Sequence, residues 1–175
     1  MKKIYVDADA CPVKEEIIRV ANRHKLNVLM VCNGGIRPFK SDLVKLIIVS
    51  EGSDEADKWI YDQVSKDDIV ITADIPLAAK CIAKEAVVLK HDGNFLTENN
   101  IGNVLATRDL MSDLRSSDPF LKGKNKPYSK ADRSKWKNSP CYWNYVSGPK
   151  ADRSEWKNSP CCRNYVSGPK ADRFE

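Results

Sequence analysis

Short apolar stretches alternate with amphipathic segments along the first two thirds of the chain, and this alternation constrains the fold most. Five stretches have the composition of buried strands, at residues 2–8, 26–33, 43–50, 67–74 and 86–90. Segments with helical apolar spacing lie between and after them, one starting at Pro12 and others over 53–64, 75–85 and 97–117. Apolar strands alternating with helices are typical of a parallel sheet covered on both faces. The sequence therefore predicts a three-layer α/β fold with a mostly parallel sheet.

Aspartates follow the predicted strands at the points where each strand ends. Asp7 and Asp9 close the first strand, Asp54 and Asp57 open the helix after the third, and Asp74 closes the fourth. Carboxyl ends of parallel strands meet at one edge, where several carboxylates would repel one another unless a cation lies between them. Mg²⁺ and Mn²⁺ prefer oxygen ligands and serve phosphodiester chemistry. The sequence predicts that all five aspartates bind Mg²⁺ or Mn²⁺ at this edge.

Most of these aspartates also have a structural interpretation as helix caps. Asp9 precedes the helix expected at Pro12, Asp74 precedes "IP", and Asp54 with Asp57 three residues later resembles a capping box. Asp7 differs, because it ends a buried strand one residue too early for an ordinary cap. Several aspartate caps at one sheet edge are less expected than one shared metal site, so we favour the metal site.

Other polar residues near the same edge are candidates for binding a substrate. Asn33, Lys14 and Arg37 are candidates for contacting phosphate, although a solvated helix residue is the better interpretation of Lys14. Cys11 stands at a strand-to-helix turn, where a helix N-terminus lowers a thiol pKa. Because the sequence places no histidine beside it, a buried small residue is the better interpretation of Cys11.

Several classes of protein are disfavoured by composition. No run of about 18 apolar residues is present, so no membrane span is expected. Lys2 and Lys3 are followed almost at once by Asp7, which argues against a secretory signal. The six cysteines form no CxxC pair and the chain has two histidines, which argues against structural zinc. We therefore expect a cytoplasmic protein with reduced thiols.

The last third of the chain differs in charge and is repetitive. Residues 1–120 carry 16 Lys or Arg and 19 Asp or Glu, whereas residues 121–175 carry 13 and 5. Residues 130–149 recur as residues 150–169 with three differences, which indicates a recent tandem duplication. We expect an α/β domain over residues 1–120 and a basic, poorly ordered tail over 121–175. Such a tail is compatible with non-specific binding of RNA.

Four motifs resemble those of the YaiI/YqxD family of bacterial proteins: "VDADACPVK" (6–14), "DEADKWI" (54–60), "DDIVITADIPLA" (67–78) and "GKNKPYSKADR" (123–133). The resemblance covers about residues 2–135 and implies a PIN-like fold. PIN-like nucleases use an aspartate after the first strand, an acid on a helix and a Thr-x-Asp after a later strand. Asp7, Asp57 and the segment Thr72–Asp74 match those positions. The resemblance therefore implies metal-dependent cleavage of RNA, while the 20-residue repeat replaces the usual ending of the family.

Three functions remain open from the sequence. The first is a Mg²⁺- or Mn²⁺-dependent ribonuclease with Asp7, Asp57 and Asp74 as catalytic residues. The second is a haloacid dehalogenase-type phosphatase with Asp7 as nucleophile and Asp9 as acid and base. It fits less well, because Cys11 stands where such enzymes have Thr or Val and a later Lys and paired-Asp motif is missing. The third is a non-catalytic RNA-binding module that uses the basic tail.

Overall fold

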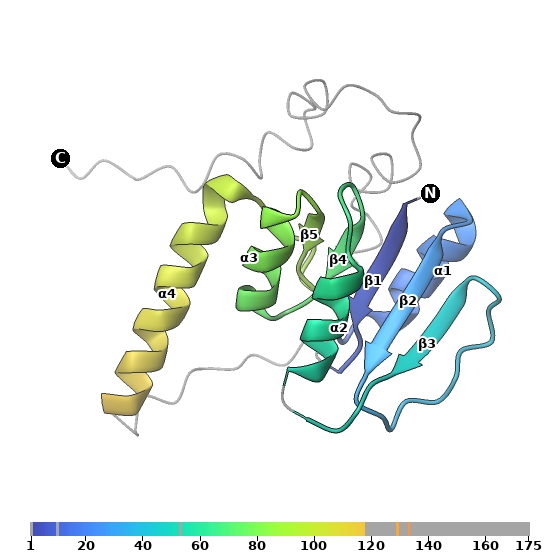
Figure 1. The fold of residues 1–175 in the computed structure, drawn as a ribbon, viewed down its shortest axis with the longest axis horizontal. Coiled ribbons are helices and arrows are strands. Elements are labelled where there is room, and N and C mark those ends of the chain that lie inside the picture. The colour runs from blue at the N-terminus through green and yellow to red at the C-terminus, as the bar shows by residue number, and fades with distance from the viewer. Residues whose placement is uncertain (1, 10, 53, 118–128, 130–132, 134–175) are drawn as a thin grey trace.

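The computed structural model describes residues 2–9, 11–52, 54–117, 129 and 133. These residues form one six-stranded sheet and four helices (Figure 1). In chain order the elements are β1 (Lys3–Asp7), α1 (Lys14–His24), β2 (Asn27–Cys32), β3 (Val44–Ile48), α2 (Glu55–Gln63), β4 (Ile69–Ile71), α3 (Ile75–Ala83), β5 (Val87–Leu89), β6 (Phe95–Leu96) and α4 (Glu98–Ser117).

The strands lie in the order β3-β2-β1-β4-β5-β6. The first five strands in the chain are parallel, and β6 is antiparallel to β5. The order reverses direction at β1, which pairs with β2 on one side and with β4 on the other. In open α/β sheets, ligands bind outside the carboxyl ends of the strands at such a switch point. The topology therefore directs attention to the residues that follow β1 and β4.

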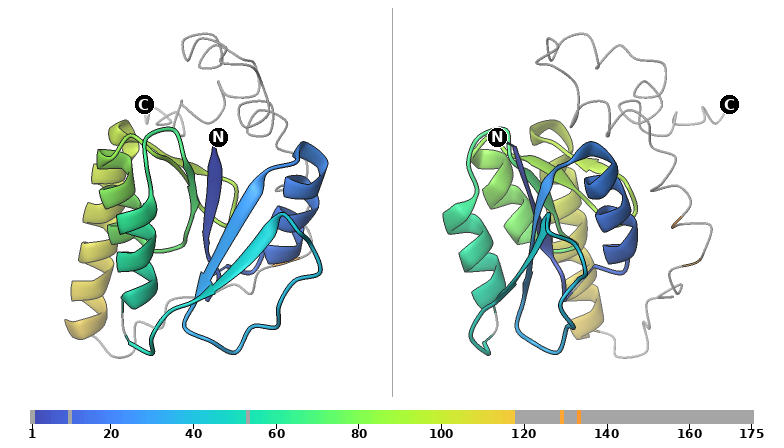
Figure 2. Two further views of the ribbon diagram at one scale, coloured as in Figure 1. Left: turned by 45° about the vertical axis from the view of Figure 1, so that its right-hand side comes forward. Right: turned by 90° about the vertical axis from the view of Figure 1, so that its right-hand side faces the viewer.

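Helices cover both faces of the sheet, which confirms the predicted three-layer α/β fold. Figure 2 shows α1 on one face and α2 with α3 on the other. Helix α4 packs beside α3 and lies farther from the sheet centre (Figure 1). The carboxyl ends of β1 and β2, at the bottom of Figure 1, lie near the starts of α1 and α2.

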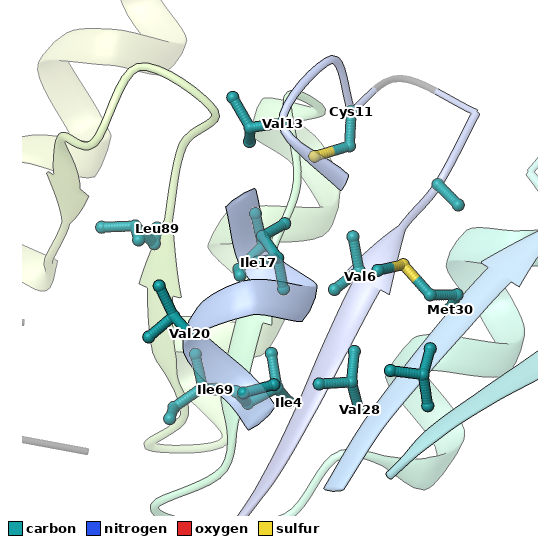
Figure 3. Close-up of a cluster of buried hydrophobic side chains, with 14 of the residues drawn as sticks. Ile4, Val6, Cys11, Val13, Ile17, Val20, Val28, Met30, Ile69 and Leu89 are labelled. Carbon is teal, nitrogen blue, oxygen red and sulfur yellow. The ribbon is translucent and has the colours of Figure 1, made fainter. Parts of the chain in front are cut away.

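Alternate residues of each strand point to opposite faces, so the sheet separates two apolar cores. Ile4 and Val6 of β1 pack with Ile17 of α1 in the first core (Figure 3). Tyr5, between them, packs with Ile60 of α2 in the second core. Each buried side chain of this size contributes about 1.5–3 kcal/mol to folding. The face of the sheet on which a side chain lies therefore alternates from one strand residue to the next. The same alternation determines the face on which the polar residues at the strand ends lie.

Two details differ from the expectations. Helix α1 begins at Lys14 rather than Pro12, because Cys11 and Val13 are buried in the core and Pro12 lies in the turn between them. The short strand β6 was not predicted, since two residues show no periodicity. Thr97 directly precedes α4, and its backbone N–H donates to Asn100 Oδ1 at 2.8 Å. This bond is the return half of a capping box.

The predicted tail over residues 121–175 lies outside the described residues, apart from Ser129 and Arg133. The domain boundary at residue 120, the poor order of the tail and its binding of RNA therefore stay predictions. In the described part of the chain, no helix combines the length and the apolar character needed to cross a membrane.

Candidate active site at the carboxyl edge of the sheet

Asp7 and Thr72 lie side by side where β1 and β4 end. Both are buried, with exposed fractions of 6% and 1%. The Thr72 hydroxyl donates to Asp7 Oδ2 at 3.1 Å and accepts the backbone N–H of Asp74 at 2.9 Å. One hydroxyl group therefore fixes both the Asp7 carboxylate and the start of the turn that carries Asp74.

Asp74 and Asp57 stand at the N-termini of two helices that cover the same face. Asp74 is the N-cap of α3, and its Oδ2 accepts the backbone N–H of Leu77 at 3.3 Å, so its predicted capping role is confirmed. Asp57 lies in the first turn of α2. The positive ends of the two helix dipoles favour negative charge at these positions.

The pKa of Asp57 is raised by its burial and by the neighbouring carboxyl groups. The pKa of Asp57 is raised to about 7, first by burial of the carboxyl group and next by its side-chain hydrogen bond with Asp74. The negative charges of Asp74, Asp7 and Asp54 act in the same direction. Burial and the neighbouring carboxylates together favour the protonated form of Asp57, and a cation beside the same carboxylates would favour the ionised form.

Asp54 and Asp9 flank this cluster and do not cap their helices. Asp54 is exposed at the N-cap position of α2 with a left-handed φ of 67°, and its side chain makes no capping bond. Asp9 is also exposed, and its Oδ2 accepts the backbone N–H of Asn33 at 2.8 Å. The N-cap of α1 is Val13, also without a side-chain capping bond. The capping interpretations of Asp54 and Asp9 are therefore wrong.

The donor set suits a hydrated divalent cation. In the part of the chain that the structure describes, no group of three His, Cys, Asp or Glu side chains is arranged to hold a metal ion. Mg²⁺ commonly keeps several waters and binds through one or two carboxylates together with substrate phosphate. Asp7, Asp57 and Asp74 are the carboxylates that would offer oxygen ligands of this kind, and the charge of Asp54 acts on Asp57 beside them. A cation held by one or two of the three is compatible with this arrangement.

Lys14 and Arg37, two of the three residues predicted to contact phosphate, line one pocket of about 740 Å³. Arg133 and His91 also line it, as do Asp9 and Glu15. Its apolar wall includes Ile36 and Phe39, which pack against the core beneath α1. The pocket therefore opens on the α1 side of the carboxyl edge, whereas Asp57 and Asp74 lie on the side of α2 and α3.

Asn33, the third predicted substrate contact, joins two loops. Besides its backbone bond to Asp9, its side-chain Nδ2 donates to the carbonyl oxygen of Gly52 at 3.1 Å. These bonds fix the end of β2 to the turn after β1 and to the segment before α2. Asn33 thus positions the edge of the site.

Phe39 and Arg133 are among the pocket residues that the sequence reasoning missed. Phe39 follows Arg37 by two residues, in a loop that opens with Gly34 and Gly35 at φ of +126° and +73°, values that glycine adopts readily. An aromatic residue beside an arginine in such a loop is a usable signal. Arg133 ends the motif over residues 123–133, but nothing in that motif indicates a position at the carboxyl edge, because only the tertiary structure brings Arg133 into one pocket with Lys14.

Cys11 is a structural residue. Burial raises the pKa of its thiol to about 11, with smaller contributions from the charges of Asp7 and Glu16. This shift is opposite to the lowering expected at a helix N-terminus, and the thiol is protonated at neutral pH. The interpretation of Cys11 as a buried small residue is confirmed.

Fold and site together define a three-layer α/β protein with a carboxylate cluster at the switch point of its sheet. The chain belongs to the YaiI/YqxD family, since a family model described as "Uncharacterized BCR, YaiI/YqxD family" matches residues 5–139. The resemblance predicted from the four motifs is therefore confirmed. The match ends within the first copy of the repeat, and residues 150–169 lie beyond it.

The curated relatives carry the name UPF0178. The UPF0178 protein of Roseobacter denitrificans is 57% identical over 136 residues, which cover 78% of this chain and 90% of the relative. That of Parvibaculum lavamentivorans is 50% identical over 139 residues, covering 79% and 91%. That of Agrobacterium fabrum is 51% identical over 132 residues, covering 75% and 86%. No solved structure matches the chain significantly.

Proposed function

We propose that the protein is a divalent-metal-dependent nuclease with a PIN-like fold that cleaves RNA. One observation carries the proposal: Asp7 is buried at the end of β1, is held by Thr72, and lies with Asp57 and Asp74 where two helix N-termini meet. A partly buried carboxyl group whose pKa is raised in a cluster of carboxylates is a candidate functional group, and one use of such a cluster is to bind a divalent cation. Mg²⁺ or Mn²⁺ is the cation expected from the oxygen ligands.

Each residue of the cluster has a distinct role in this proposal. Asp7 and Asp74 are carboxylate ligands whose orientation is fixed by the Thr72 hydroxyl and by the first turn of α3. Asp57 acts as the third carboxylate ligand after its carboxyl group, whose pKa is about 7, has lost its proton. When bound, the cation would supply charge that stabilises the phosphodiester oxygens during cleavage.

The position of Asp9 favours a nuclease over a haloacid dehalogenase-type phosphatase. The phosphatase requires Asp7 and Asp9 to act on the same phosphate as nucleophile and acid. Asp9 instead lines the pocket with Lys14 and accepts the backbone N–H of Asn33, whereas Asp7 is bonded to Thr72. The two carboxylates therefore serve two neighbouring regions of the edge.

The test is cleavage of end-labelled single-stranded RNA with Mn²⁺, with Mg²⁺ or with EDTA. The variants are Asp7→Asn, Asp57→Asn and Asp74→Asn, and the matched control is Asp62→Asn on the exposed side of α2, which makes the same change of charge. We expect cleavage by the parent and by the control, and its loss with EDTA and in each of the three variants.

Cleavage that survives all three substitutions would overturn the proposal, because it would come from elsewhere in the molecule or from a contaminant. An aryl phosphate substrate is tested in parallel. Phosphate release that depends on Asp7 alone, without RNA cleavage, would establish the phosphatase instead. Binding of RNA without turnover would establish the binding module.

A further inference from the structure

We propose that the pocket on the α1 side binds one unpaired nucleotide of a single-stranded RNA, with its base against Phe39 and its phosphates on Lys14, Arg37 and Arg133. The inference rests on the proposed function for the identity of the strand. It adds a recognition site on the other side of the β1–α1 turn from the carboxylate cluster.

The cations of the pocket come from three separate parts of the chain. Lys14 begins α1, Arg37 lies in the loop after β2, and Arg133 follows α4 in the sequence. Arg37 and Arg133 are exposed and Lys14 is half-buried, so their charged groups remain available to a ligand. Convergence of three such side chains on one pocket is suited to an anion with several oxygens, such as the phosphate backbone of a nucleic acid.

The apolar wall of the pocket offers a surface for a base beside the cations that would bind phosphate. Ile36 and Phe39 are half-buried and pack against the core beneath α1, so one side of each is anchored while the pocket receives the other. A base stacks on an aromatic ring only when it is unpaired, and such stacking is the usual way of holding single strands. An apolar wall beside a set of cations therefore favours a single-stranded ligand over a duplex.

The pocket also contains carboxylates that select among nucleic acids. Asp9 and Glu15 line it, and an ionised carboxylate only accepts hydrogen bonds. The ribose 2′-hydroxyl is a donor that RNA has and DNA lacks. We therefore expect a preference for RNA over DNA of the same sequence.

Binding is measured in EDTA by fluorescence anisotropy, so that cleavage plays no part. The ligands are a short single-stranded RNA, the same RNA as a duplex, the corresponding DNA, and AMP. Phe39→Leu is matched with Phe95→Leu, because both rings are half-buried against the same core. Arg37→Gln and Arg133→Gln are matched with Arg23→Gln in the last turn of α1, an exposed arginine outside the pocket.

Substitution of the Phe39 ring and of the arginines is expected to change different properties of RNA binding, the affinity in the first case and the salt dependence in the second. Phe39→Leu should weaken single-stranded RNA binding about tenfold with an unchanged salt dependence. Each arginine substitution should lower the slope of log K against log salt by about 0.7, the value for one phosphate contact on a single strand. Duplex RNA should bind more weakly than the single strand and should not respond to Phe39→Leu. The two control variants, Phe95→Leu and Arg23→Gln, should match the parent.

The proposal is overturned if Phe39→Leu binds the single strand as the parent does, or if duplex and single strand bind equally. It is also overturned if no RNA binding occurs, or if AMP binds more tightly than the RNA, which would indicate a site for free nucleotides. Because these measurements need no turnover, they separate the two proposals. If the protein binds RNA in this way but does not cleave it, the pocket proposal stands and the nuclease proposal is overturned. If the protein cleaves RNA but the pocket substitutions do not change RNA binding, the nuclease proposal stands and the pocket proposal is overturned.

Discussion

Two buried aspartates lie at opposite ends of the same pair of strands, and their surroundings differ. Asp68 precedes β4, is 7% exposed, and accepts the backbone N–H groups of Lys3 at 3.0 Å and Ser65 at 3.1 Å. Asp7 ends β1, is 6% exposed, and is held by a side-chain hydroxyl beside other carboxylates. The two aspartates are equally buried for different reasons. Asp68 accepts hydrogen bonds that hold the strand ends together, whereas Asp7 adds its negative charge to a cluster of other carboxylates.

The largest expected effect comes from exchanging each of these aspartates for asparagine. Asp68→Asn places an amide group against one of two backbone donors, and should lower the free energy of unfolding by about 1.5–3 kcal/mol. Asp7→Asn can still accept from Thr72 and relieves repulsion, so it should leave stability unchanged or raise it. RNA cleavage should fall at least about 100-fold in Asp7→Asn, the scale on which electrostatic groups act in active sites. Urea unfolding and cleavage rates measure both.

The proposed difference between Asp68 and Asp7 is contradicted if Asp68→Asn and Asp7→Asn have the same effects on stability and RNA cleavage. A destabilised Asp7→Asn would assign Asp7 to the fold in the same way as Asp68. A folded Asp68→Asn variant without cleavage would extend the site to the other edge of the sheet.

The second expected effect is a dependence of stability on pH. The folded pKa of Asp57, about 7, lies above its ordinary value of 3.8, so the folded state binds more protons between these values. In EDTA, the stability contributed by this group is complete below about pH 4 and is lost as the pH rises to about 7. Thermal unfolding should show this loss in the parent and a smaller loss in Asp57→Asn. Identical pH profiles for the two proteins would contradict the assignment.

The same measurement with Mg²⁺ or Mn²⁺ sharpens the comparison. A cation that binds the deprotonated cluster should raise the unfolding temperature of the parent most above about pH 7, where Asp57 has lost its proton. Asp7→Asn should respond less. An equal response of parent and variant would place the cation elsewhere.

The acidic side of the edge was predictable from sequence because strand ends are local features. Asp7 and Asp74 each follow an apolar stretch, and in a parallel sheet all such ends meet at one edge. The strand order is a global property, so adjacency of β1 and β4, which brings Thr72 to Asp7, could not be derived from periodicity. Whether Asp9 capped a helix depended on where α1 begins, and burial of Val13 decided that.

The pocket side was predicted only in part, for the same reason. Lys14 and Arg37 are predictable because each follows a strand in the sequence, and the structure places both in the pocket. Arg133 is distant in sequence from either, and no pattern of apolar residues connects it to the sheet. Asn33 also follows a strand, and its hydrogen bonds to Asp9 and Gly52 explain its position.

A third, smaller effect is expected at Thr72. Thr72→Val keeps the shape of the side chain but removes the acceptor of the Asp74 N–H and the donor to Asp7. It should cost about 1–3 kcal/mol of folding free energy and lower cleavage about tenfold, whereas Thr72→Ser should restore both. Full cleavage in a folded Thr72→Val variant would show that Asp7 is oriented without this hydroxyl.

The smallest effect is expected at Asp54, which tests how far the contrast between buried and exposed carboxylates extends. Asp54 is exposed and acts on Asp57 through charge, so solvent and salt should screen most of its contribution. Asp54→Asn should weaken Mg²⁺ binding about two- to threefold at low ionic strength, and the difference from the parent should vanish near 1 M salt, where the Debye length is about 3 Å. Calorimetric titration at both salt concentrations measures this. Because an exposed charge acting at a distance is screened and a ligand in direct contact with the cation is not, a salt-independent loss would make Asp54 a ligand in its own right and would move the binding site outward from Asp7.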